Sequence, residues 1–324
     1  MAPIEQRGWC IFECCLSCVR KSAHCCLALS PLSQADDLVC PRYWGDVVRA
    51  CQVGRLPPQT PDAFEATLCE GMANGEVRFT NGKDATAVCI PQYREGFMRL
   101  MRIGGMLNFY NCGWADAEAQ LLFAAIQWAH GAGATTQAET LLLGSNKLTD
   151  AVVPLLVEVV EAGALPQLLE LNLEDNELGD AALGALQPLL KGSLSHLGAL
   201  GLGTRLTAEG ARSLCTLLSD GHLAQLEEFD LRGNHALGDA GAIAIATALS
   251  NQCLPKLVLL RLESTGIGEA GASSLADALR GAPAVKMLVI GENPFGTAMR
   301  AKIKAACDER DITAFSTFGK LLVV

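Results

Sequence analysis

Aromatic side chains are scarce in this sequence. Only 5% of its 324 residues are Phe, Trp or Tyr, although 50% are hydrophobic. This balance is expected when Leu and Ala fill most of the interior. The chain also lacks any run of about 18 apolar residues, so no membrane span is expected. It contains no Asn-x-Ser/Thr glycosylation acceptor.

Catalytic and metal-binding patterns are absent as well. No nucleophile elbow, pair of metal-binding histidines or phosphate-binding loop is found. The histidines fall at unrelated positions of the sequence, so they do not suggest a shared site. We therefore expect a protein that is not an enzyme and uses neither a cofactor nor a metal ion. The five histidines are His24, His130, His196, His222 and His235.

Basic residues are outnumbered by acidic ones in the C-terminal two-thirds of the sequence. Residues 1–104 hold 11 Lys+Arg and 11 Asp+Glu, whereas residues 105–324 hold 14 and 24, which accounts for the net charge of −10. A nucleic-acid-binding surface needs a basic patch to neutralise phosphates. The acidic balance therefore argues against nucleic acid as the main ligand.

Cysteine is unevenly distributed, because 10 of the 14 lie within the first 104 residues. A disulfide framework would require an oxidising compartment. Glu5 and Glu13 interrupt the basic and apolar regions that a secretory signal needs. We therefore expect reduced thiols and a cytoplasmic location.

Four interpretations of the N-terminal cysteines compete. A zinc site is disfavoured because Cys15-x-x-Cys18 has no second matched pair. Cys25 and Cys26 follow basic residues and could anchor the chain to a membrane if both carried palmitate. A redox sensor has no support in the pattern. The favoured interpretation is a buried helix in which cysteines act as small hydrophobic groups. Cys10, Cys14 and Cys18 are spaced by four residues and would lie on one face of that helix.

One short pattern recurs every 28 to 34 residues. It reads apolar-x-apolar-x-x-Asn-x-apolar, and a fixed period of this size indicates a stacked solenoid rather than a closed globule. Its copies begin at Leu107, Leu141, Leu171, Leu200, Phe229, Leu260 and Leu288.

The best copy reads Leu168-x-x-Leu171-x-Leu173-x-x-Asn176-x-Leu178. Alternation of Leu171 and Leu173 predicts a strand with both leucines on one face. Asn176 falls where the strand must turn, and its amide can bond backbone groups there. Asn146, Asn234 and Asn293 sit at the equivalent position, while Cys112, Thr204 and Thr265 replace the asparagine and supply part of that bonding.

A helical period follows each turn. Acidic residues at the helix starts meet the positive end of the helix dipole. Thr149 and Thr207 are predicted N-caps, and Pro154 and Pro188 fall inside two runs whose helices should start late or end early. Short helices are expected at Asp150–Val160, Glu209–Leu218, Asp239–Leu249 and Glu269–Leu279.

The consensus Leu-x-x-Leu-x-Leu-x-x-Asn-x-Leu resembles the leucine-rich repeat, and its period with a true helix is similar to the ribonuclease-inhibitor-like subclass. The resemblance covers roughly residues 104 to 324. It implies an α/β right-handed solenoid, or horseshoe, with parallel strands inside and helices outside. It also implies binding of a protein on the concave face. The first copy departs most, because Phe109, Cys112 and Trp114 replace Leu, Asn and Leu.

Four segments are expected. Residues 1–40 form a Cys-rich segment, interpreted as a remnant because Arg7–Glu13 resembles part of Toll/interleukin-receptor-like modules. Residues 41–103 form a helical N-terminal cap that covers the first open strand, with helices near 64–69 and 86–101. Residues 104–296 form the repeat array of about seven copies. Residues 297–324 form a C-terminal cap with a basic helix and an added terminal strand.

The register also predicts which side chains face the concave side, because they alternate with the buried leucines. This face is acidic, with arginines among the acids and apolar spots beside them. A protein partner with basic and apolar contact groups would fit it. The candidate partner-binding residues are Tyr110, Leu142, Glu170, Asn172, Glu174, Glu228, Asp230, Arg232, Leu259, Arg261 and Glu263.

The sequence thus favours a non-catalytic scaffold that binds a protein through this face. Two alternatives remain open at this stage. One is a regulator of a small GTPase of the GTPase-activating type, because one such activator family uses this repeat subclass. The other is the sensor portion of a larger receptor.

Overall fold

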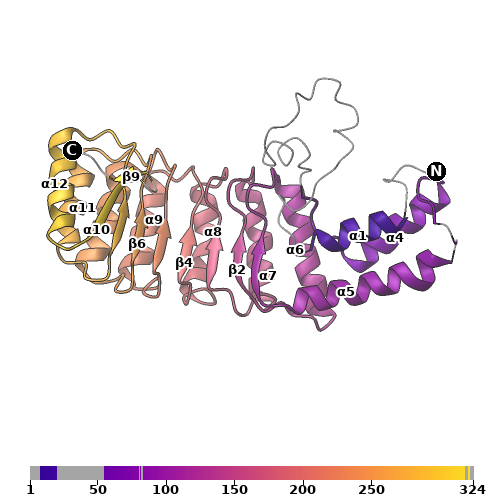
Figure 1. Ribbon diagram of the computed structural model, residues 1–324. Helices are drawn as coiled ribbons and strands as arrows, with labels where there is room; N and C mark the ends of the chain where they lie inside the picture. Colours follow the sequence, from indigo (N-terminus) through magenta and orange to yellow (C-terminus); the bar gives the residue numbers. More distant parts are fainter. Residues whose placement is uncertain (1–7, 20–54, 80, 82, 318–319, 322–324) are drawn as a thin grey trace, which may run out of the picture.

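A computed structural model describes residues 8–19, 55–79, 81, 83–317 and 320–321. From residue 105 onward the chain alternates strand and helix in regular units. The strands lie side by side in one layer and the helices stack behind them in a second layer (Figure 1). The predicted α/β solenoid of strand–turn–helix repeats is confirmed.

The described residues form a nine-stranded sheet whose strands follow one another in chain order. Strands β1 to β8 are parallel, and β9 pairs antiparallel with β8. The strands are β1 (Gly105–Asn108), β2 (Ala138–Leu142), β3 (Glu170–Asn172), β4 (Ala199–Gly201), β5 (Glu228–Asp230), β6 (Leu259–Arg261), β7 (Met287–Val289), β8 (Thr313–Thr317) and β9 (Lys320–Leu321).

One helix follows each strand from β1 to β7. Most of these helices are rich in Ala and Leu, and small alanines allow close helix–helix approach. The helices are α6 (Asp116–Gly131), α7 (Val153–Glu161), α8 (Asp180–Lys191), α9 (Ala208–Ser219), α10 (Gly238–Ser250), α11 (Glu269–Leu279) and α12 (Thr297–Asp308).

The core is one continuous apolar layer between sheet and helices. The repeated leucines pair in register along the sheet, as Leu171 with Leu200 and Leu260 with Leu288. Each of these four side chains is almost fully buried. No repeat could bury its apolar face alone, so the stacking of neighbours stabilises all of them.

The predicted asparagine turns are confirmed as a ladder between repeats. The Asn176 amide nitrogen donates to the carbonyl oxygens of Leu143 (2.9 Å) and Leu173 (3.1 Å). Its side-chain oxygen accepts from the backbone nitrogen of Leu148 at 3.0 Å. Where Thr265 replaces asparagine, its hydroxyl donates to the Leu262 carbonyl oxygen at 2.8 Å. The ladder satisfies buried backbone groups that the tight turns leave unpaired.

Helix ends follow the predictions with one exception. Thr149 and Thr207 are N-caps, accepting from Ala151 and Glu209 backbone nitrogens. Pro154 lies in the first turn of α7, which starts late after the 3-10 turn η4 (Asp150–Val152). The expected early end at Pro188 is wrong, because α8 continues to Lys191. Burial of the leucines that follow Pro188 offsets the lost helix hydrogen bond.

Within the described residues, the helices before the array are α1 (Gly8–Ser17), α4 (Pro61–Ala73), the π-helical turn η3 (Ala85–Cys89) and α5 (Ile90–Arg102). They pack through aromatic rings: Phe64 stacks on Tyr93 with centroids 3.9 Å apart, and Phe97 meets Trp128 of α6 edge to face. Figure 1 places them at the end of the sheet beside α6. Helices were expected near residues 64–69 and 86–101, and α4 and α5 lie there.

Arg55, in the segment just before α4, contacts the edge of β1. The guanidinium of Arg55 donates to the Asn108 carbonyl oxygen and lies 4.0 Å from the Phe109 ring centroid. The Trp114 indole donates to the Arg55 carbonyl oxygen at 2.6 Å. Arg55 therefore covers part of the edge of the first strand, and the helical N-terminal cap stays a prediction. The segment boundaries at residues 40, 103 and 296 stay predictions.

The far end of the sheet is closed by the predicted extra strand. β8 pairs with β7 in parallel register, and Ile312 before it is buried. β9 then folds back on β8. Phe318 lies outside the described residues, and so does the end of the expected apolar tail.

The cysteine predictions can be compared with the structure only in part. Cys18 is buried, directly after the end of α1. Cys25 and Cys26, the candidate acylation sites, lie outside the described residues. Among the described helices, none is long and apolar enough to cross a membrane.

Candidate functional site

The face of the sheet opposite the helices carries all the predicted partner-binding residues. We call it the open sheet face. Strand register aligns the last residue of each strand into one row, which runs through Leu142, Asn172, Gly201, Asp230 and Arg261. A second row passes through Glu170, Glu228 and Leu259. The alignment predicted from the repeat period is therefore present.

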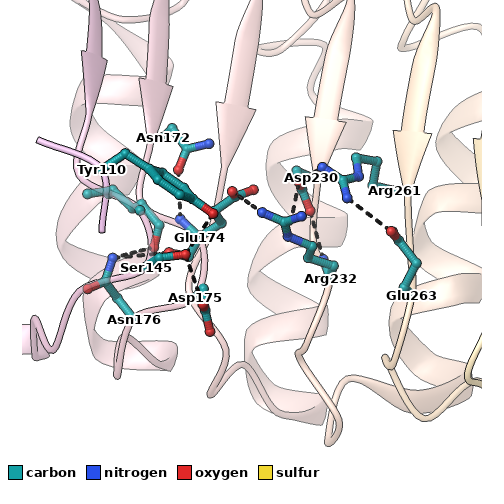
Figure 2. Close-up of polar contacts among 12 residues, drawn as sticks. Tyr110, Ser145, Asn172, Glu174, Asp175, Asn176, Asp230, Arg232, Arg261 and Glu263 are labelled. Atoms are coloured by element: carbon teal, nitrogen blue, oxygen red, sulfur yellow. Dashed lines mark hydrogen bonds and ion pairs between the residues drawn. The ribbon is translucent and has the colours of Figure 1, made fainter. Parts of the chain in front are cut away.

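An ion-pair network occupies the middle of this face (Figure 2). Arg261 places one guanidinium nitrogen 3.1 Å from Asp230 Oδ2 and another 3.0 Å from Glu263 Oε1. Arg232 donates its backbone N–H to Asp230 Oδ1 at 3.0 Å and directs its guanidinium to Glu174. We call Glu174, Asp230, Arg232, Arg261 and Glu263 the central network.

The Arg232–Glu174 pair crosses a whole strand, because Glu174 follows β3 and Arg232 follows β5. The strand between them, β4, presents Ala199, Gly201 and then Gly203 to this side. These residues have little or no side chain, so the guanidinium can lie across them. A Cβ atom at Gly201 would already lie 3.5 Å from Asn172 and Glu174.

Three carboxylates of the central network are buried. Glu174, Asp230 and Glu263 expose only 4%, 3% and 7% of their surface. Burial, with a hydrogen bond to Glu174 as the next cause, raises the pKa of Asp230 to about 7. The negative charge of these three side chains is therefore buried, and this part of the face does not present open carboxylates to a partner.

Glu263 of the central network has one oxygen atom without a donor among the described residues. Its Oε2 atom is buried and has no hydrogen-bond partner within the described part of the chain. Three buried carboxylates face two guanidinium groups, so the central network carries a net charge of −1 when every group is ionised.

The remaining predicted residues are more accessible. Glu170, Glu228, Leu142, Asn172 and Leu259 are all partly exposed. Burial raises the pKa of Glu228, and the neighbouring charges of Asp230 and Glu170 add to the effect. These side chains remain within reach of an approaching molecule.

The N-terminal end of the open sheet face is more apolar. Tyr110 exposes 38% of its surface and Met106 on β1 exposes 50%. The Tyr110 hydroxyl lies 2.7 Å from Ser145 Oγ, which lies 2.9 Å from Asp175 Oδ2. This polar row fixes the ring of Tyr110 at the border of the sheet (Figure 2).

The central network was not predicted from the sequence. The pattern placed Glu174 and Arg232 on one face but separated them by a full repeat. The signal that could have joined them is the loss of side chains in the copy between them, at Gly201 and Gly203. A long side chain such as arginine spans about two strand spacings of ~4.8 Å only across an empty strand.

No group of three or more His, Cys, Asp or Glu side chains in the described ranges is arranged to hold a metal ion.

Comparison with known proteins gives three similarities. A family described as Leucine Rich repeat matches residues 165–186 and 222–246. A ribonuclease inhibitor from Sus scrofa is 31% identical over 189 residues, covering 58% of this chain and 39% of that protein. The chain therefore spans about two-fifths of that relative's length. A chain in the crystal structure of the Rad7 and Elc1 complex in yeast aligns with a TM-score of 0.42 and 16% identity, over 72% of this chain and 67% of that one.

The sequence matches agree with what the structure shows independently. Parallel strands alternate with helices at the repeat period, and asparagines join successive turns. The chain therefore contains leucine-rich repeats, and over 58% of its length it is similar to a ribonuclease inhibitor.

Proposed function

We propose that this chain is a non-catalytic scaffold that binds a protein partner through the open sheet face. The observation that carries the proposal is the arrangement of side chains on that face. Accessible groups stand in aligned rows over several strands, while the central network holds the middle of the face rigid. A preorganised surface loses less entropy on binding than a flexible one.

The partner's chemistry follows from the accessible residues. Glu170 and Glu228 offer negative charge, whereas Tyr110, Leu142 and Leu259 offer apolar area. A partner with basic and apolar contact groups complements both. Charge would speed its approach, and a few buried apolar anchors would supply most of the affinity. We propose that this binding takes place in the cytoplasm.

The test reverses charge at accessible positions only. Glu170→Lys with Glu228→Lys changes the face without removing a member of the central network. The matched control, Glu158→Lys with Glu161→Lys, makes the same charge change on exposed positions of α7 in the helix layer. Quantitative affinity capture from native cells is the measurement.

We expect the sheet-face pair to lose the partner by about tenfold or more, which corresponds to roughly 1.4 kcal/mol. The α7 pair should capture the same protein at the level of the unaltered chain. Equal capture by all three would contradict a partner site on the open sheet face.

A further inference from the structure

One row of the open sheet face stays accessible along the whole array. The strand register aligns one residue from each of β1 to β7 into this row, which we call the accessible row. Each of its side chains is partly or fully exposed, whereas the neighbouring row is buried at Gly201, Asp230 and Val289. The accessible row consists of Met106, Thr140, Glu170, Ala199, Glu228, Leu259 and Met287.

The chemistry of the accessible row changes in order along the sheet. Its ends are apolar, because Met106 exposes 50% of its surface and Met287 is partly exposed. Its middle is acidic, with Glu170 on β3 and Glu228 on β5, and the small side chain of Ala199 lies between them on β4. A complementary ligand must therefore present apolar groups at its ends and two positive charges between them.

Both glutamates can receive a cationic group from such a ligand. Thr140 Oγ1 donates to Glu170 Oε2 at 3.1 Å, which orients this carboxylate through one of its two oxygen atoms. The arginines near Glu228, Arg232 and Arg261, are already paired with carboxylates of the central network. Burial, together with neighbouring carboxylates, raises the pKa of Glu228, so a cation bound beside it would favour its charged form.

The spacing of the row selects a backbone conformation for the ligand. Neighbouring strands lie about 4.8 Å apart, so the two glutamates are about 9.6 Å apart, and each methionine is the same distance from the nearer glutamate. In a polyproline II helix, residues three apart lie on one face with a separation of about 9.3 Å. Residues on one face of an extended strand are only about 6.7 Å apart, and residues seven apart in an α-helix are separated by about 10.5 Å.

The total length of the row agrees with the same conformation. From β1 to β7 it spans about 29 Å, and a polyproline II segment of ten residues spans about 28 Å. Three steps of seven residues in an α-helix would span about 31.5 Å, so the mismatch would grow along the row.

We infer that the accessible row binds a proline-rich segment in the polyproline II conformation, with apolar, basic, basic and apolar residues at every third position. This inference rests on the proposed function and names the part of the partner that contacts the face. Positions 4 and 7 of the segment place their basic groups beside Glu170 and Glu228, and positions 1 and 10 contact the methionines at the ends. Such a segment is already ordered before it binds, so it loses little entropy.

The experiment compares two fluorescent peptides of identical composition against the full chain. The first is Leu-Pro-Pro-Lys-Pro-Pro-Lys-Pro-Pro-Leu, and the second has its lysines moved to positions 3 and 8. Fluorescence anisotropy gives both dissociation constants. We expect the first peptide to bind about tenfold more tightly, because only its lysines share a face with its leucines. Equal affinities, or no binding by either peptide, would overturn the inference.

A third peptide tests the helical alternative. It is a helix-forming sequence with the same Leu, Lys, Lys and Leu at positions 1, 8, 15 and 22. Weaker binding than that of the first peptide is expected, and tighter binding would overturn the inference.

Protein variants locate the first peptide on the accessible row. Glu228→Gln and Met287→Ala should each weaken its binding by about fivefold, because each removes one matched contact. Glu161→Gln removes a carboxylate from an exposed site of α7 and should leave the affinity unchanged. An equal loss in Glu161→Gln and Glu228→Gln would mean that the peptide responds to net charge and not to the row, and would overturn the inference.

The peptide comparison needs only the unaltered chain, so it decides the question even if a variant fails to fold. The cell-capture comparison does not depend on the partner's backbone conformation. A chain that captures its partner through the open sheet face but shows no preference between the two ten-residue peptides would contradict this inference and leave the scaffold function intact.

Discussion

Asp230 is buried and lies 3.1 Å from the Arg261 guanidinium, and this environment has a consequence for stability. Its pKa is raised to about 7 in the folded protein from an ordinary value of 3.8. A carboxyl with a raised folded pKa stabilises the fold fully at a pH below its unfolded pKa. That contribution is lost as pH rises through the folded pKa.

We therefore predict that Asp230→Asn removes one component of the pH dependence of the unfolding free energy. Relative to the unaltered chain, the variant should gain stability between about pH 4 and pH 7, by up to roughly 4 kcal/mol as an upper bound. The reason is that the neutral amide never carries the buried charge. Urea unfolding midpoints at several pH values measure the difference. Glu161→Gln at an exposed site of α7 is the control, and an Asp230→Asn curve parallel to the original would contradict the prediction.

Strand β4 differs from its neighbours because its turn is one residue shorter. In other turns, a residue with positive φ directly precedes the asparagine of the ladder. Examples are Ser145 (φ 53°) before Asn146 and Asp175 (φ 50°) before Asn176. After Leu202 the chain goes directly from Gly203 to Thr204, whose hydroxyl donates to the Asn176 carbonyl oxygen at 2.7 Å. The shorter turn brings the backbone of Gly203 against Leu178 of the preceding repeat.

Two glycines, one at the end of β4 and one in the turn after it, should consequently respond differently to substitution by alanine. A Cβ atom at Gly203 would lie 2.5 Å from Leu178 Cβ and 2.9 Å from its carbonyl oxygen, so the backbone must shift. We expect Gly203→Ala to destabilise the fold by roughly 1–3 kcal/mol. A Cβ atom at Gly201 meets its neighbours at 3.5 Å, an ordinary contact. Gly201→Ala should change stability by no more than about 0.5 kcal/mol.

Denaturant unfolding of both variants measures this difference within a single repeat. Equal losses of unfolding free energy in the two variants would contradict the prediction. The close approach of Gly203 to Leu178 would then not restrict residue 203 to glycine.

Elements were predictable where one physical rule decided them. The alternation of Leu171 and Leu173 placed a strand and its buried face, and the ladder position placed Asn176 in a turn. Helix α11 was predicted at its observed limits of Glu269 and Leu279. Each of these features depends on local periodicity, which can be read directly from the sequence.

Other features depend on tertiary contacts that periodicity does not encode. Pro188 does not end α8, because packing of the following leucines outweighs the local preference. The pairing of Arg232 with Glu174 depends on side-chain reach across β4, and the near-complete burial of Asp230 is likewise a property of the folded sheet. The rows of the open sheet face could therefore be predicted, but not which of their charges are already neutralised.

At the level of the whole molecule, the solenoid must protect its first strand. β1 has a neighbour on one side only within the sheet, and its other edge meets Arg55 and the segment before α4. Phe109 and Trp114 beneath that segment expose no more than 2% of their surface. An uncovered strand edge beside apolar rings is a template for association with another chain.

The final prediction compares two deletions. Removing residues 1–103 takes away Arg55 and the aromatic rings of α4 and α5, so β1 and the facing side of Trp128 become exposed. We expect this shortened chain to form oligomers or aggregates at concentrations of roughly micromolar, where association through exposed strands becomes significant. Removing residues 1–7 deletes none of the described contacts, so that chain should elute like the full-length protein. Size-exclusion chromatography with light scattering gives the mass of each.

The contradicting outcome is a chain of residues 104–324 that matches the full-length protein in assembly state and unfolds cooperatively. In that case stacking between neighbouring repeats would be enough to hold β1 in the sheet without cover on its outer edge.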